Sequence, residues 1–211
     1  MKKLFYAIIF FAVINTTAKA QLEISPVAGY FFSTNINFYE GYMKIKDNMA
    51  YGINLGVRLD DSRILEFSYI GSTNEVEWRP YNGFYDYPAT SFNITSNYFL
   101  LSGIQEVPVQ ENVLGFGTAK LGAGYFKPVD ARINDVWRFS FGLGVGLKYF
   151  VNDKIGLRFQ ADLLFPLYFN GGGAYCGIGT GGTSCGVGVS SSSAIMQGDI
   201  SAGLIFLLGN K

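Results

Sequence analysis

Apolar and polar residues alternate along most of the chain beyond its first twenty positions. From Ile155 to Leu167, every second side chain is Ile, Leu, Phe or Ala, and Arg158, Gln160 and Asp162 stand between them. Successive side chains of a strand point to opposite faces, so this pattern predicts an extended strand with one apolar face. A helix of the same residues would have no continuous apolar stripe.

The same alternation predicts eight strands. They span residues 22–33, 49–59, 64–73, 92–105, 113–126, 139–151, 155–167 and 196–208. The pattern is weakest at 113–126, because Phe116 and Lys120 fall on one face, which a bulge or a filled barrel interior would explain. These strands are longer than the ~5–6 residues typical of soluble proteins, and a tilted membrane strand needs about 9–11.

The connections between these strands alternate in length. Short ones lie at 60–62, 107–112 and 152–154, and long ones at 34–47, 74–90, 127–137 and 170–194. Short turns at one end and long loops at the other are typical of outer-membrane barrels, and an even strand number puts both termini at the short-turn, periplasmic end. We therefore predict an all-β fold, an eight-stranded antiparallel up-and-down transmembrane β-barrel.

The first twenty residues have the features of a secretory signal peptide. A basic start precedes the eleven-residue apolar stretch 4–14, and Ala18 and Ala20 flank a small-x-small cleavage site. Eleven residues are too few to cross a membrane as a helix. We predict cleavage after Ala20 and a single barrel domain over 21–211, with 13 basic and 16 acidic residues and a net charge of −3.

Composition excludes several classes of function. Charged residues are 15% of the 211 residues, the 16 basic residues equal the 16 acidic ones, and histidine is absent. A neutral, charge-poor chain lacks the excess of basic residues by which proteins bind nucleic acid. Without histidine it has no Ser-His-Asp or Cys-His catalytic system and cannot build most catalytic zinc sites. We predict no enzymatic activity, no cofactor, no metal and no nucleic-acid partner.

Isolated charges occupy the polar face of the predicted strands. A soluble barrel would instead carry many Lys and Glu residues on its outer face. We place on the inner face Glu23, Arg58, Glu66, Lys120, Lys148, Arg158, Asp162 and Asp199, four basic and four acidic side chains. Because a narrow eight-stranded barrel is filled by its own side chains, these charges need partners. We expect a structural salt-bridge network that plugs the lumen. The alternative is a gated ion path through the same residues.

The last strand carries the most specific motif. Ser201, Gly203, Phe206 and Leu208 are spaced like the C-terminal signal read by the barrel-assembly machinery, although Leu208 replaces the final aromatic residue and three residues follow it. The chain from 21 to 208 resembles the small outer-membrane β-barrel family, the OmpA, OmpX and OmpW type. The resemblance implies assembly into the outer membrane of a gram-negative envelope, with that machinery and periplasmic chaperones as partners during biogenesis and lipid as the surroundings.

Two features of the predicted long loops suggest further roles. Cys176 and Cys185 are the only cysteines, and in an oxidising compartment a disulfide between them is the expected state. The loop at 74–90 is rich in aromatic residues, which dominate binding hot spots. The candidates for external recognition are Trp78, Tyr81, Phe84, Tyr85 and Tyr87. The alternative is that these aromatic residues pack among themselves.

These inferences favour a non-enzymatic, monomeric outer-membrane barrel with a plugged, charge-balanced lumen. It would act in envelope integrity, adhesion or surface recognition through its extracellular loops, with a ligand that the sequence does not identify. One alternative is a narrow porin-like or OmpW-like channel for small or apolar solutes. Another is an accessory subunit of an envelope secretion or assembly machine.

Overall fold

The structure is a computed structural model, and it describes residues 21–33, 36–37, 41–81, 90–129, 135–179, 182–194 and 196–209. The strands, in chain order, are β1 (Leu22–Ser33), β2 (Ile36–Asn37), β3 (Gly41–Ile45), β4 (Asn48–Arg58), β5 (Arg63–Pro80), β6 (Thr90–Gln110), β7 (Val113–Pro128), β8 (Val136–Phe150), β9 (Ile155–Gly179), β10 (Gly182–Ala194) and β11 (Gln197–Leu208). The described residues contain no helix long and apolar enough to cross a membrane.

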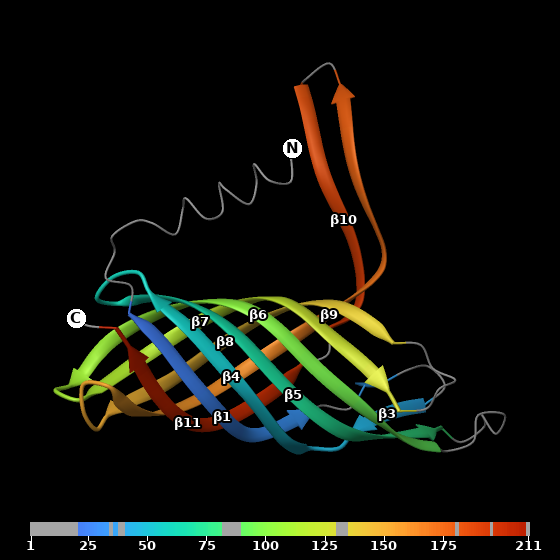
Figure 1. The fold of residues 1–211 in the computed structure, drawn as a ribbon. Coiled ribbons are helices and arrows are strands. Elements are labelled where there is room, and N and C mark those ends of the chain that lie inside the picture. Colours follow the sequence, from blue (N-terminus) through green and yellow to red (C-terminus); the bar gives the residue numbers. More distant parts are fainter. Residues whose placement is uncertain are drawn as a thin grey trace, which may run out of the picture.

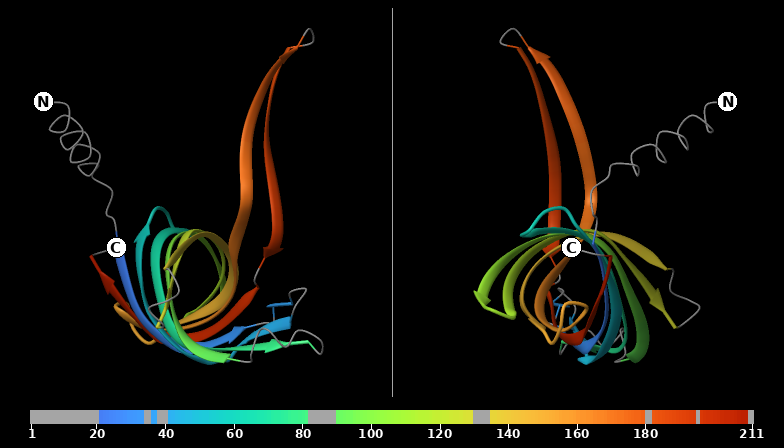
Figure 2. Two further views of the ribbon diagram at one scale, coloured as in Figure 1. Left: turned by 90° about the vertical axis from the view of Figure 1, so that its right-hand side faces the viewer. Right: turned by 60° about the vertical axis from the view of Figure 1, so that its left-hand side comes forward.

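Eight of these strands close into a barrel (Figures 1 and 2). Going round the ring, β1 pairs with β4, followed by β5, β6, β7, β8, β9 and β11, and every neighbouring pair is antiparallel. At the seam between β1 and β11, Leu22 lies opposite Leu208 and Ser33 opposite Gln197. Closure removes the open edges that a sheet of this length would otherwise expose. The predicted all-β, eight-stranded up-and-down fold is confirmed.

Three barrel strands run well beyond their predicted ends. β5 has 18 residues, β6 has 21 and β9 has 25, which exceeds the membrane requirement of about 9–11. Much of the segments 74–90 and 170–194, expected as loops, is therefore strand. Alternation fails to reveal these extensions because a strand outside the membrane needs no apolar outer face.

The end of β9 and all of β10 form a two-stranded ribbon that leaves the barrel at its long-loop end (Figures 1 and 2). The sole partner of β10 among the described strands is β9. Within the ribbon, Cys176 lies directly opposite Cys185. A second extension lies at the same end, where β3 pairs with the outer part of β5 from Ile45 opposite Val76 to Gly41 opposite Pro80.

The barrel inverts the usual distribution of apolar and charged side chains. On β8, the outward residues Leu143, Val145 and Leu147 are 57%, 65% and 49% exposed, whereas the inward Lys148 is fully buried. Soluble proteins almost never bury a charge this deeply while exposing a continuous apolar band. The outer surface is therefore suited to contact lipid, with the charges inside.

The irregular pattern at 113–126 results from a filled interior. The register of β7 against β8 runs without a shift from Val113 to Phe126. Phe116 and Lys120 both point into the lumen, where they are 5% and 1% exposed. Since the lumen accepts both an aromatic ring and an ammonium group, one strand face carries both residue types without a bulge.

Candidate functional site: the barrel lumen

The centre of the lumen is a bidentate ion pair. From β9, Arg158 donates to the Glu66 carboxylate of β5, with Nη1 2.5 Å from Oε2 and Nη2 2.9 Å from Oε1. Both side chains are fully shielded from solvent. Two parallel hydrogen bonds of this kind fix geometry as well as charge, so this pair holds opposite walls of the barrel at a set spacing.

Further ion pairs extend from this centre toward the short-turn end. The Lys148 ammonium lies 2.6 Å from Glu23 Oε1 and 2.8 Å from Glu106 Oε1. Arg58 Nη1 in turn lies 2.7 Å from Glu106 Oε2, and Arg158 Nη1 is 3.6 Å from Glu23 Oε1. We call the linked side chains the periplasmic ion-pair chain, because short turns are expected at the periplasmic end of such a barrel. Its members are Arg58, Glu106, Lys148, Glu23, Arg158 and Glu66.

An aromatic ring lies within this chain. The Phe116 ring has the Arg158 guanidinium carbon 4.9 Å from its centroid and the Lys148 ammonium 5.6 Å away. A cation over a ring face is attracted by the ring quadrupole, more strongly where water is excluded. Phe116 therefore compensates part of the desolvation of two buried cations.

A second, smaller group of charges lies nearer the long-loop end. Lys120 on β7 contacts Asp162 on β9, with Nζ 2.7 Å from Oδ2. Gln160 joins the two groups, because its Oε1 accepts from Arg158 Nε at 2.8 Å and its Nε2 donates to Asp162 Oδ2. Asp199 on β11 lies directly opposite Asp162 in the register of β9 and β11.

An apolar layer closes the lumen beyond these charges. Its buried members are Phe31, Ala50, Ile70, Tyr98, Leu100 and Leu164, and Phe126 packs against them. The Phe31 and Tyr98 rings stack with centroids 5.9 Å apart, and Tyr98 donates its hydroxyl hydrogen bond to Gln197 Oε1. Tyr98, Leu100 and Leu164 have no exposed surface. This layer separates the charged core from the long-loop end.

The short-turn end contains a cavity of about 620 Å³. Residues from the turns line it, including Asp60, Asp61, Glu111 and Asp153. Arg58 lies at this cavity and also pairs with Glu106. The cavity therefore borders the periplasmic ion-pair chain.

The structure places all eight sequence-selected charges on inner-face positions, although the Arg58 side chain is 20% exposed. It adds Glu106, which is 3% exposed and lies one residue beyond the predicted strand 92–105. Continuing the period of two from Ser102 and Ile104 would have found it. Among the described residues, the inner face then carries five acidic and five basic side chains, because the half-buried Arg138 follows the same alternation as the buried Ser140 and Lys148 on β8. The expected balance of charge stays a prediction.

The candidates for external recognition are only partly described. Trp78 lies within β5 and Tyr81 just beyond it, with the Tyr81 and Tyr42 rings 6.2 Å apart. Phe84, Tyr85 and Tyr87 lie outside the described residues, as do Ala18 and Ala20. The side chains of Cys176 and Cys185 are not described either, although their backbone positions are opposed.

Exposed ion pairs accompany the aromatic residues on the β3–β5 extension. Glu77 accepts from Lys46 at 2.6 Å and from Arg79 at 2.9 Å, and Lys46 also lies 3.0 Å from Glu75. Hydrogen bonds from Lys46 and Arg79 lower the pKa of Glu77, and those to Glu77 and Glu75 raise the pKa of Lys46. The extension thus presents aromatic rings beside a mixed-charge surface.

The residues of the C-terminal motif divide between the two faces of β11. Ser201 is buried on the inner face, while Phe206 and Leu208 are 38% and 51% exposed on the outer face. At Gly203, a side-chain carbon would lie 2.2 Å from the Pro26 carbonyl oxygen of β1. Glycine is thus required at this point of the seam by the close approach of β1.

Comparison with solved structures identifies the fold. The outer membrane protein OprG from Pseudomonas aeruginosa has a TM-score of 0.56 to this chain at 10% identity, with 90% of this chain and 97% of OprG covered. The chain has the fold of a small outer-membrane β-barrel. Neisserial surface protein A gives a TM-score of 0.53 at 14% identity, with coverage of 90% and 97%. No protein-family model and no curated protein matches the sequence. The apolar outer surface of this barrel is suited to contact with membrane lipid.

Proposed function

We propose that this barrel is a non-conducting, non-enzymatic outer-membrane protein that acts in envelope integrity, adhesion or surface recognition. The observation that carries the proposal is the filling of the lumen by two successive barriers. The periplasmic ion-pair chain blocks it with side chains such as Arg158 and Lys148, which have no exposed surface. The apolar layer, with Tyr98 and Leu164 also fully buried, blocks it again.

Both barriers resist the passage of ions for physical reasons. An ion that crosses the charged part must displace a paired carboxylate or guanidinium, which leaves an uncompensated buried charge. The apolar layer then offers few groups to replace the water of hydration. An eight-stranded barrel has an interior just wide enough for its side chains. A plugged lumen leaves the parts outside the membrane as the contact surfaces.

Single-channel recording in a planar bilayer tests this proposal. The full-length mature protein is compared with an Arg158→Ala/Asp162→Ala variant, which removes the centre of the ion-pair chain and the partner of Lys120. We expect a silent wild type and a variant that leaks or unfolds. Reproducible open states of the wild type, altered in conductance by the double substitution, would instead support the narrow channel.

The extensions at the long-loop end are the proposed contact surfaces. The β9–β10 ribbon and the β3–β5 sheet both project beyond the ring, and the latter carries Trp78, Tyr81 and a cluster of charges. Cells that express a variant lacking residues 172–188 would be compared with cells that express Trp78→Ala/Tyr81→Ala. Attachment to host-cell layers and entry of a dye excluded by intact outer membranes are measured in both.

Loss of attachment with normal dye exclusion would support recognition, and increased dye entry would support a role in integrity. If neither variant changes either readout while the protein co-purifies with an envelope complex, the accessory-subunit alternative is favoured.

The maturation steps form part of the same proposal. We propose cleavage after Ala20, a single monomeric domain over 21–211, and recognition of Ser201, Gly203, Phe206 and Leu208 by the barrel-assembly machinery after delivery by periplasmic chaperones. The placement of the motif on β11, which closes the ring against β1, supports this role. The amino-terminal sequence of the purified protein and its mass in detergent test the first two statements.

A further inference from the structure

Asp199 is a buried lumen charge without an ion-pair partner among the described residues. The periplasmic ion-pair chain contains three basic and three acidic side chains, and its charges cancel. The other buried charges of the described lumen residues are Lys120, Asp162 and Asp199, and Lys120 pairs with Asp162. Among the described residues, no Lys or Arg side chain lies within ion-pair distance of Asp199, which is 3% exposed. A carboxylate buried without a cation is strongly disfavoured, so a compensating positive charge is missing beside Asp199.

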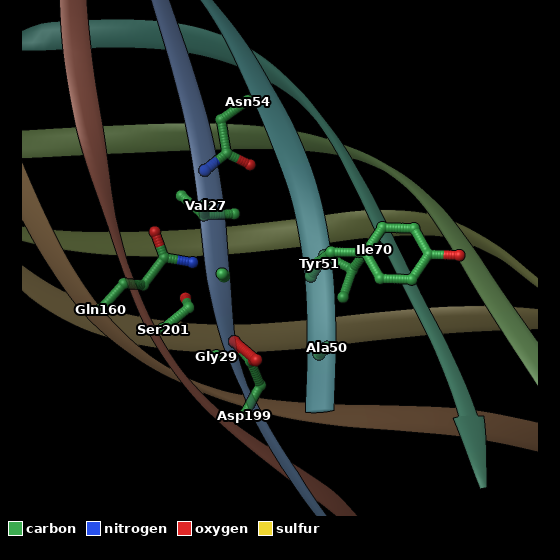
Figure 3. Close-up of a pocket in the computed structure, with 10 residues that line it drawn as sticks. Val27, Gly29, Ala50, Tyr51, Asn54, Ile70, Gln160, Asp199 and Ser201 are labelled. Carbon is green, nitrogen blue, oxygen red and sulfur yellow. The ribbon is translucent and has the colours of Figure 1, made fainter. Parts of the chain in front are cut away.

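A small cavity lies against this carboxyl group. Its volume is about 10 Å³, and its polar lining comes from Asp199, Asn54, Gln160 and Ser201, which Figure 3 shows converging from β4, β9 and β11. Asn54 is 2% exposed, and its Oδ1 has no hydrogen-bond partner. About 10–15 Å³ is the space one water-sized particle needs. The cavity thus offers an unused buried acceptor beside an uncompensated carboxyl group.

The charged groups around Asp199 do not supply the missing counter-ion. The charges that act on Asp199 are those of Asp162 on β9 and Lys120 on β7. Tyr98 on β6 is the further titratable group in the adjoining apolar layer. On β1, β4, β5, β6, β8 and β9, the other buried charges of the described residues belong to the periplasmic ion-pair chain and are already paired. The half-buried Arg138 lies on the inner face of β8 beyond Ser140, toward the long-loop end. A ligand of charge +1 at the cavity would compensate Asp199.

We propose that the cavity binds one water-sized monovalent cation, either an alkali-metal ion or a hydronium whose proton is shared with Asp199. Oxygen atoms of Asp199, Asn54 and Ser201 are its ligands. A divalent ion fits poorly, because the single unpaired carboxylate at the cavity would balance only half of its charge. The described residues also contain no group of three or more Asp, Glu, His or Cys side chains suited to a metal. The bound cation compensates the charge of Asp199 and adds to the stability of the barrel.

Urea unfolding of the protein in phosphatidylcholine vesicles tests this site. Midpoints are measured in NaCl and in choline chloride of equal ionic strength, each between about pH 6 and about pH 9. If a proton is the ligand, the folded barrel binds one more proton than the unfolded chain. Its stability then falls as the pH rises, and the unfolding constant increases by up to about tenfold per pH unit. If Na⁺ is the ligand, the midpoint at the higher pH is greater in NaCl than in choline chloride.

Two variants assign the response to this cavity. Asp199→Asn keeps the shape of the side chain and removes its charge, so we expect it to abolish the dependence on pH and on Na⁺. Glu106→Gln also removes one lumen negative charge but lies in the other group of ion pairs, so it should keep the response. Asp199→Ser serves as a second variant if Asp199→Asn does not fold.

The proposal is overturned if the wild-type midpoint depends on neither pH nor Na⁺, or if the Asp199 variants keep the wild-type dependence. It is overturned as well if Glu106→Gln abolishes the response as completely as Asp199→Asn does, since net charge alone would then explain it.

Discussion

Arg158 and Glu66 meet at the centre of the lumen through two hydrogen bonds, although 92 positions separate them in the sequence. They come from β9 and β5, which are not neighbours in the ring. The pair therefore acts as a strut between opposite walls. Because the pair is fully buried, the effect on stability of replacing one residue depends on whether the other is still present.

Removal of one partner should be much more damaging than removal of both. We expect Glu66→Ala to lower the free energy of unfolding by about 3–5 kcal/mol, because it leaves the Arg158 charge without its main counter-ion. The double substitution Glu66→Leu/Arg158→Met should recover most of this loss. Urea unfolding in vesicles measures both, with Arg63→Ala in the exposed Asp60–Arg63 pair as a control of little effect. Equal losses for single and double variants would contradict the strut.

The strands and their faces could be predicted from the sequence because the membrane imposes a period of two along each spanning strand. That constraint ends at the membrane boundary, so the sequence does not predict how far a strand continues outside it. Glu106 lies one residue beyond a predicted end, and the outer parts of β5 and β9 fall in segments predicted as loops. Ion-pair partners such as Lys148 and Glu106 could not be assigned, because partners across the lumen depend on strand tilt and side-chain reach rather than on register.

Two glycines of β7 should respond oppositely to the same substitution. A side-chain carbon at the inward Gly122 would lie 2.0 Å from the Phe99 carbonyl oxygen, whereas at Gly117 nothing lies within 4 Å. We expect Gly122→Ala to destabilise the barrel by about 1–3 kcal/mol, since backbone must move. Gly117→Ala should be neutral or stabilise it by about 0.4–1 kcal/mol, because the unfolded chain loses freedom. The urea midpoints of the two variants test this difference. Similar losses of stability in both would contradict the close approach of β6 to Gly122.

The turn between β4 and β5 should keep its charge in acid. Hydrogen bonds from the Ser62 backbone and the Arg63 side chain lower the pKa of Asp60 to about 2 from its usual 3.8. A lowered pKa means that the carboxylate stabilises the turn at all pH values above the unfolded value, and that this contribution is lost as the pH falls toward 2. Nuclear magnetic resonance titration of the Asp60 carboxyl carbon in detergent micelles measures this. In an Arg63→Ala variant, the titration should move to higher pH, and an unchanged midpoint would exclude the side-chain contribution.

The β9–β10 ribbon should be closed by a disulfide between Cys176 and Cys185. Directly opposed residues of antiparallel strands have α-carbons about 4.5–5.5 Å apart, within the 4.4–6.8 Å that a disulfide spans. Ten residues from one cysteine to the other would be closed, which stabilises the ribbon by about 2–3 kcal/mol in the chain-entropy model. We expect the protein from outer membranes to react with maleimide only after reduction, and the reduced ribbon to be cut faster by proteinase K while the barrel stays protected. Cys176→Ser provides the control, because its remaining thiol labels without reduction. Labelling of both cysteines in the unreduced wild type would show that the ribbon is held by its backbone pairing alone.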